Sequence, residues 1–212
     1  MLSQIRRTLC NFEYNHYSEL RTLDDELNNL YFRPITLSDM ALIRTVRGYK
    51  PRFGLNCFLA DNATVVGEVV MGDNCTVWFN AVVRGDVNAI TIGNNTNIQD
   101  GAVIHGTYQK SATRIGNNVS IAHNAIVHGC TISDNVLIGM GAIIMDDAVI
   151  ESDVVIAAGA VVLAGTVVES GSIYAGMPAK KVKAISAEMK AVIQRTAKNY
   201  PMYAEWFKEP AS

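Results

Sequence analysis

The chain has few charged residues and no excess of either sign. Asp, Glu, Lys and Arg make up 18% of its 212 residues, and 18 basic groups against 20 acidic ones give a net charge of −2 at pH 7. Nucleic acids and anionic membranes attract proteins through concentrated positive charge, so we expect neither as a partner. Hydrophobic residues form 49% of the chain. None of their runs approaches the roughly 18 residues that a membrane span requires.

Cysteine is scarce and has no spacing typical of a metal site. The four cysteines are Cys10, Cys57, Cys75 and Cys130, and no two of them form a C-x-x-C pair. We therefore expect neither a zinc ribbon nor a disulfide scaffold, but reduced thiols and a cytoplasmic location. The chain also lacks a G-x-x-x-x-G-K loop and a strand–helix alternation, which argues against the common nucleotide-binding folds.

Three regions differ in composition. Residues 1–39 carry leucines at helix-like spacing and predict a partly helical N-terminal extension. Residues 40–179 are dominated by Val, Ile and small residues, and form the candidate core domain. Residues 180–212 predict a C-terminal helical segment, in which Ser186 is the N-cap and Pro201 ends the helix. The lysines and arginines of that segment are most simply a solvated face.

An aliphatic residue recurs every six positions through the middle of the chain, with three changes of phase. The nineteen repeat positions are Leu59, Val65, Met71, Val77, Val83, Ile92, Ile98, Ile104, Ile115, Ile121, Val127, Ile132, Ile138, Ile144, Ile150, Ile156, Val162, Val168 and Tyr174. A period of six fits neither a helix nor a simple alternation, but it fits a short strand followed by a bend. Three such sides close a triangular coil, and coils stack about 4.8 Å apart around the aliphatic residues. The sequence therefore predicts a parallel β-helix.

These repeats, over roughly residues 55–178, resemble the hexapeptide-repeat family. The resemblance implies that the coils wind left-handed, against the usual preference for right-handed crossovers. The expected fold is thus an all-β core, a left-handed parallel β-helix, with flanking α-helices.

Counting the repeats assigns residues to the sides of the triangle, because positions three repeats apart lie above one another. By this count Arg84, His105 and His128 stack at one edge. His105 and His128 are then one strand spacing apart, close enough for both imidazoles to bind one metal ion at ~2.0–2.1 Å. His123 falls toward the far end of its side and should not reach that pair within its own chain. If three chains pack around a threefold axis, His123 of one chain could complete a three-histidine site on its neighbour.

A narrower resemblance rests on four strings. They are Val83-Arg84-Gly85-Asp86, Asn97-Ile98-Gln99-Asp100-Gly101, Ile104-His105 and Ile121-Ala122-His123-Asn124-Ala125-Ile126-Val127-His128-Gly129. In these strings the chain resembles the γ-class carbonic anhydrase family. The resemblance implies a homotrimer in which His105, His123 and His128 bind Zn²⁺, or Fe²⁺ or Co²⁺, at subunit boundaries. It also implies reversible hydration of CO₂ to bicarbonate by metal-bound hydroxide.

The resemblance extends to further site residues. It implies an intersubunit ion pair between Arg84 and Asp86, and a role for Gln99 and Asn97 in positioning the metal-bound solvent. Tyr174 is similar to a tyrosine near the family's site. As the last repeat position, Tyr174 could equally close the end of the prism.

One feature departs from the family's pattern. Val87 and Asn88 follow Asp86 where an acidic residue is expected, and the loop over residues 106–114 contains no carboxylate. The sequence thus shows no evident group to carry the proton away. Two other functions stay open. One is acyl or acetyl transfer from coenzyme A, with a histidine as general base, and the other is a scaffold or thioesterase-like accessory protein with weak or no anhydrase activity.

Overall fold

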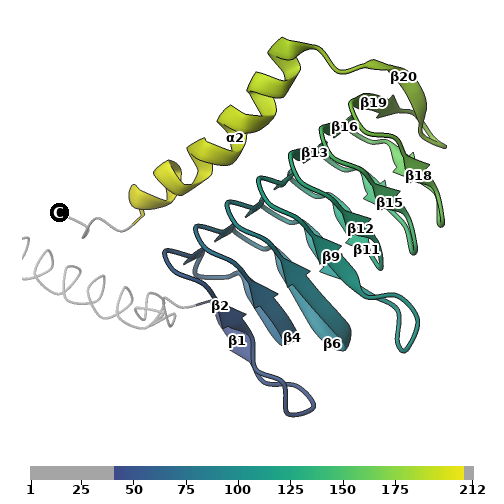
Figure 1. Ribbon diagram of the computed structural model, residues 1–212. Coiled ribbons are helices and arrows are strands. Elements are labelled where there is room, and N and C mark those ends of the chain that lie inside the picture. Colours follow the sequence, from purple (N-terminus) through teal and green to yellow (C-terminus); the bar gives the residue numbers. More distant parts are fainter. Residues whose placement is uncertain (1–40, 208–212) are drawn as a thin grey trace, which may run out of the picture. The chain divides into compact units, whose positions relative to one another are not determined.

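The structure is a computed structural model that describes residues 41–207. Over these residues the chain forms a left-handed parallel β-helix followed by the helix α2 (Ala187–Glu205), as Figure 1 shows. The predicted fold class is confirmed. The expected N-terminal extension, residues 1–39, lies outside the described residues. In the described part of the chain, no helix is long and apolar enough to cross a membrane.

The stacked coils have three faces, and each face is a ladder of parallel strands. The first face carries β1 (Leu42–Arg44), β4 (Thr64–Met71), β6 (Val82–Ile92), β8 (Val103–His105), β11 (Ile126–His128), β14 (Ile143–Ile144) and β17 (Val161–Val162). The second carries β2 (Arg52–Phe53), the later parts of β4 and β6, β9 (Thr113–Ile115), β12 (Thr131–Ile132), β15 (Val149–Ile150) and β18 (Val167–Val168). The third carries β3 (Phe58–Leu59), β5 (Thr76–Val77), β7 (Asn97–Ile98), β10 (Ser120–Ile121), β13 (Val136–Ile138), β16 (Val154–Ile156), β19 (Ser172–Ala175) and the antiparallel β20 (Lys180–Ala184).

The repeat positions form the core. All of them are buried except Leu59, which is half-buried. Val83 pairs with Ile104, and Ile104 pairs with Val127, as the count of repeats requires. Each buried Val or Ile side chain contributes about 1.5–3 kcal/mol relative to leaving it in water. The axial column of aliphatic residues therefore holds the coils together.

Two interruptions of the repeat shape one edge of the prism. The step of nine residues between Val83 and Ile92 is the long strand β6, which turns the corner between the first two faces; β4 follows the same path beside it and shifts register after Gly67. The step of eleven residues between Ile104 and Ile115 is a loop after β8, closed by a bridge between Thr107 and Ser111. Both insertions lie beside His105, at the end of β8.

The C-terminal segment contains a strand as well as the expected helix. Ser186 is the N-cap of α2, since its hydroxyl accepts from the backbone N–H of Met189 at 3.2 Å. The prediction that Pro201 ends the helix is wrong, because α2 continues through it to Glu205. A proline removes a single backbone donor from the helix. Burial of Ala204 against the rest of the chain holds the final turn.

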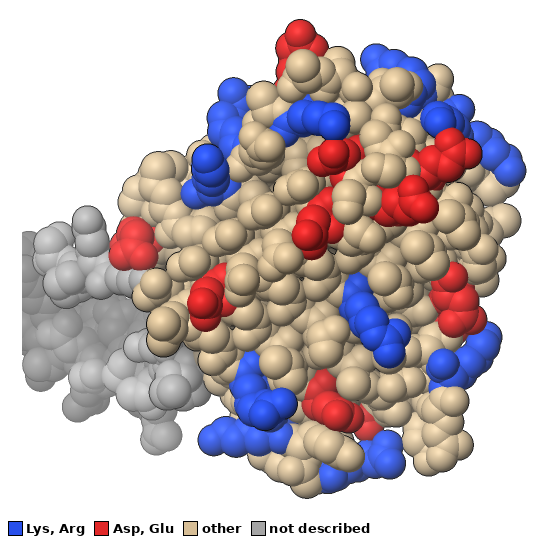
Figure 2. Space-filling model, viewed as in Figure 1, with Lys and Arg blue, Asp and Glu red and all other residues tan. Residues whose placement is uncertain are grey.

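The helix α2 runs back along the third face (Figure 1). Its Tyr200 packs edge-on against Trp78, with ring centroids 5.4 Å apart. One of its basic groups is paired with an acidic one on the coils: Nζ of Lys190 lies 2.9 Å from Oδ2 of Asp153. Figure 2 shows basic side chains interspersed with acidic ones on this side of the molecule. The basic residues that the structure describes in the C-terminal segment are all exposed, as expected of a solvated face: Lys180, Lys181, Lys183, Lys190, Arg195 and Lys198.

Candidate functional site

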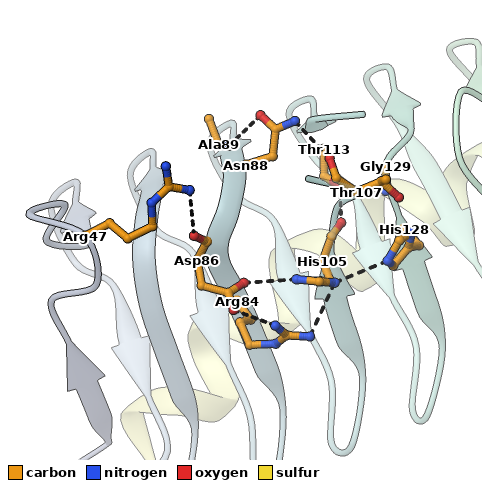
Figure 3. A network of polar contacts seen from close by, with 10 residues as sticks. All are labelled: Arg47, Arg84, Asp86, Asn88, Ala89, His105, Thr107, Thr113, His128 and Gly129. Carbon is orange, nitrogen blue, oxygen red and sulfur yellow. Dashed lines mark hydrogen bonds and ion pairs between the residues drawn. The ribbon is translucent and has the colours of Figure 1, made fainter. Parts of the chain in front are cut away.

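His105 and His128 form a pair at the edge between the first two faces. They end β8 and β11, and the two residues are partners in the parallel register. Nδ1 of His105 lies 3.2 Å from Nε2 of His128 (Figure 3). The predicted stacking of these two histidines is therefore what the structure shows.

Each histidine of the pair also contacts a carboxylate through its other ring nitrogen. Nε2 of His105 lies 3.0 Å from Oδ1 of Asp86, and Nδ1 of His128 lies 2.5 Å from Oδ1 of Asp146. An ionised carboxylate can only accept, so each of these ring nitrogens donates its proton to the contact. In a neutral imidazole the remaining nitrogen then carries a lone pair. When both rings are neutral, the two nitrogens that face each other are both of this kind.

The electrostatics of the site favour this protonation state. Burial of His105 lowers its pKa below 6.5, and the positive charge of Arg84 lowers it further, although Asp86 acts the other way. Burial would raise the pKa of Asp86, but hydrogen bonds from Arg84 and His105 outweigh it and lower that pKa below 3.8. The pKa of Asp146 is lowered in the same way, since hydrogen bonds from Thr107 and His128 outweigh its burial. At neutral pH the site thus holds a neutral His105 beside an ionised Asp86, and an ionised Asp146 beside His128.

The donor set fits a divalent metal ion. Two nitrogens bound to one tetrahedral zinc at ~2.0–2.1 Å are about 3.3 Å apart, close to the 3.2 Å found between His105 and His128. Lone pairs that face each other repel unless a proton or a cation lies between them, and each imidazole already has the carboxylate partner typical of metal-binding histidines. One chain supplies only this pair. Among residues 41–207, no three His, Cys, Asp or Glu side chains gather in one chain as a metal site.

His123 lies apart from the pair. It sits in the turn after β10, where the chain leaves the third face, and its side chain is 43% exposed. Its Nδ1 contacts Oδ2 of Asp100 at 2.9 Å. All three predicted ligand histidines therefore have a carboxylate on one ring nitrogen. As expected from the count of repeats, the fold of a single chain does not bring His123 to His105 and His128.

Arg84 and Asp86 form an ion pair within one chain, at 2.6 Å. The family resemblance implied such a pair between subunits, whereas here both partners extend from β6 beside the histidines (Figure 3). Nη2 of Arg84 also lies 3.4 Å from Nδ1 of His105. The backbone oxygen of Asp86 accepts from Nη1 of Arg47, at 3.4 Å. Asp86 is thus fixed on both sides as the partner of His105.

The other predicted site residues belong to the third face. Asn97 and Gln99 are buried and joined: Nε2 of Gln99 donates to Oδ1 of Asn97 at 2.9 Å, and Nδ2 of Asn97 donates to Ser120 Oγ at 2.8 Å. Asn97 and Gln99 lie on either side of Ile98, at β7. This strand lies between β5 and β10, which both contact α2. Tyr174 is the last member of the buried core column, paired with Ile156. None of these three residues joins the histidine pair within one chain.

Asp146 is the site residue that the motifs missed. It accepts from both His128 and Thr107, whose hydroxyl donates to Oδ2 at 2.5 Å. The count of repeats does not single out Asp146, because the residue level with His128 in the next coil is Met145: Val127 pairs with Ile144. Asp146 follows Met145 and reaches His128 from that neighbouring coil.

Two recesses adjoin the pair. An apolar recess of about 430 Å³ beside His128 is lined by Ile126, Ile143, Met145 and neighbouring residues. A polar recess of about 180 Å³ lies beyond Asp86 and includes Arg47 and Glu68. The histidine pair therefore stands between an apolar and a polar surface.

Comparisons with known proteins place this architecture in a family. The family model described as "Bacterial transferase hexapeptide (six repeats)" matches residues 129–164. The chain is 36% identical over 167 residues to a protein of Geobacillus kaustophilus named "Carbonic anhydrase", covering 79% of this chain and 91% of that one. It is 37% identical over 169 residues to "Gamma carbonic anhydrase 2, mitochondrial" of Arabidopsis thaliana, covering 77% and 61%.

A similar solved structure is that of a hexapeptide transferase family protein from Anaplasma phagocytophilum. The two share 37% sequence identity with a TM-score of 0.75, over 78% of this chain and 98% of that one. The sequence identities and the coil architecture agree. The chain belongs to the γ-class carbonic anhydrase-like family of hexapeptide-repeat proteins.

Proposed function

We propose that this protein is a carbonic anhydrase-type metalloprotein that interconverts CO₂ and bicarbonate at sites shared between subunits of a homotrimer. In this proposal His105 and His128 of one chain and His123 of a neighbouring chain hold the metal ion. The observation that carries the proposal is the pair of facing nitrogens, 3.2 Å apart, whose opposite nitrogens are both bound to carboxylates. When both rings are neutral, these two nitrogens are placed to bind one cation, at a position where Nη2 of Arg84 lies 3.4 Å from Nδ1 of His105.

The surface around the pair supports a second copy as the source of the third ligand. The face that carries His105 and His128 continues along the stack with exposed apolar side chains: Ile126 is 38% exposed, Met145 40% and Leu163 48%. Exposed apolar side chains grouped in this way are typical of interaction surfaces. Because a threefold interface joins two different surfaces, this face would meet the part of the neighbour that presents His123.

The same interface would deliver Gln99 along with His123. Ile98 and Ile121 are partners on the third face, and Gln99 and His123 follow them in adjacent coils. The amide of Gln99 can both donate and accept, so it could orient a water molecule and then a bicarbonate. A zinc ion held by neutral imidazoles supplies a Lewis acid that lowers the pKa of water to about 7.

The chain's own carboxylates offer a route for the proton. The motif lacks an acidic residue after Asp86, but Glu68 of the preceding coil lines the same polar recess as Asp86 and Asn88. The segment after Asp86 supplies no carboxylate here, but the fold brings Glu68 to the recess from the neighbouring coil. We assign Glu68 to proton exchange between the site and the solvent.

Metal analysis and a hydration assay on the same protein test the proposal. The full chain, purified without oxygen, should carry about one metal ion per chain and hydrate CO₂ in stopped flow. His105→Ala and His128→Ala should lose both properties, while His16→Ala, outside the proposed set, should keep them. A trimer without metal, or hydration that survives removal of the metal, would overturn the proposal.

A second candidate is acyl transfer from coenzyme A. The similarity to a hexapeptide transferase family protein and the apolar recess beside His128 favour it. It predicts saturable binding of acetyl-coenzyme A, which isothermal titration calorimetry measures directly. Metal-dependent hydration together with no heat of binding would decide against the transferase. The third function, a scaffold, predicts that stripping the metal changes no measured activity.

A further inference from the structure

We propose that Asp146 is a positioning residue that fixes the orientation and the tautomer of His128, and thereby sets which nitrogen His128 offers to a metal ion. This inference rests on the proposed function, because it takes His128 to be a ligand. Asp146 belongs to none of the motifs that relate the chain to its family. It reaches His128 from the next coil of the stack.

Asp146 has the contacts that such a role requires. Its Oδ1 is 2.5 Å from Nδ1 of His128, and its Oδ2 accepts from the Thr107 hydroxyl at 2.5 Å. Both carboxylate oxygens therefore have partners, and only 17% of the side chain is exposed. Thr107 lies two residues after His105, so Asp146 connects the chain segments that carry both histidines.

The contact decides the position of the proton on the ring. An ionised carboxylate cannot donate, so Nδ1 of His128 carries a proton, and in the neutral ring Nε2 presents its lone pair toward His105. Among the described residues, Asp146 and His105 are the groups that contact the His128 ring nitrogens. If Asp146 were lost, the proton could move to Nε2, where it would lie between the two histidines and compete with a metal ion.

The neighbouring Asp147 provides a matched control. Its Oδ1 accepts from the Ser111 hydroxyl at 2.7 Å, and its Oδ2 lies 3.7 Å from Nζ of Lys110. Asp147 thus ties down the same loop as Asp146, with the same side chain, one residue away. Within the described part of the chain, Asp147 forms no hydrogen bond or ion pair with either histidine. Removing its side chain therefore removes contacts within the loop while the hydrogen bond between Asp146 and His128 stays in place.

The experiment measures the ring proton and the metal affinity separately in the full chain. Nitrogen-15 NMR of metal-free protein near neutral pH should show His128 protonated at Nδ1 in the wild type and shifted toward Nε2 in Asp146→Ala. Competition with a chelator should show Zn²⁺ binding about 10–100-fold weaker in that variant. Asp146→Asn, whose amide oxygen still accepts, should restore most of the tautomer and part of the affinity. Asp147→Gly, which removes the side chain and tolerates the φ of 60° at this position, should match the wild type.

Two results would overturn the inference: a neutral His128 ring with its proton on Nε2 in the wild type, or equal loss of affinity in Asp146→Ala and Asp147→Gly. If Asp146→Ala fails to fold, the wild-type spectrum and Asp146→Asn still decide. A wild type that binds no Zn²⁺ through the three histidines would instead refute the proposed function. The tautomer measurement is made without metal, so the two failures are distinguishable.

Discussion

The third residue after most repeat positions turns the chain around a corner of the prism with a positive φ. Examples are Asn74 and Asn118 (both 55°) and Gly101 (69°). Asn, Asp and Gly adopt this left-handed conformation at the lowest cost. The asparagines of one corner also bond each other from coil to coil: Asn95 donates to Asn118, and Asn118 donates to Asn135, each at 3.2 Å. The corner is therefore stabilised twice, by backbone preference and by a ladder of amides.

Substitution of Asn118 separates these two effects. Asn118→Ala removes both ladder bonds and places a residue with Cβ at a φ of 55°, so it should destabilise the fold by about 2–3 kcal/mol. Asn118→Gly removes the same bonds but tolerates the backbone, and it should cost about 1 kcal/mol less. Urea unfolding curves of the three proteins measure the difference. Equal losses in the two variants would mean that the backbone conformation contributes nothing.

Strands and coils follow directly from the sequence, whereas the elements that interrupt them do not. The period of six gave the register from Val83 through Ile104 to Val127, and with it the pairing of His105 and His128. It could not give the helix end, because tertiary packing beyond Pro201 overrides the local preference. The period did not identify Asp146 either. A single carboxylate forms no motif, and its role follows from its contact with His128 in the neighbouring coil.

The docking of α2 is the element whose stability is easiest to test. Ile193 is 1% exposed, the largest fully buried side chain of the helix, while Met202 of the same helix is 49% exposed. Ile193→Ala should cost about 2–5 kcal/mol, because it leaves a cavity as well as losing buried area. Met202→Ala should stay within about 0.5 kcal/mol. Denaturant midpoints followed by Trp fluorescence measure both, and similar losses would show that α2 is not held through its buried face.

At the scale of the whole molecule, the single chain supplies an incomplete site. His105 and His128 sit on one edge, and His123 sits in a turn that leaves another face. Side-chain rotation cannot bring residues on different faces of a β-helix together, because the closely packed core lies between the faces. In the proposed homotrimer a complete three-histidine site would therefore form only on assembly, and metal binding should depend on protein concentration wherever that trimer dissociates.

Mixing two inactive variants tests this dependence. His105→Ala keeps its own His123, and His123→Ala keeps its own His105 and His128, so each homotrimer alone should lack all complete sites. The two variants are unfolded together and refolded in equal amounts. Every mixed trimer then contains one boundary at which a His123→Ala chain supplies His105 and His128 and a His105→Ala chain supplies His123. Random assembly should restore about one site in four, measured as bound metal and as CO₂ hydration. Sites built within one chain would restore none, because every chain in the mixture lacks a ligand.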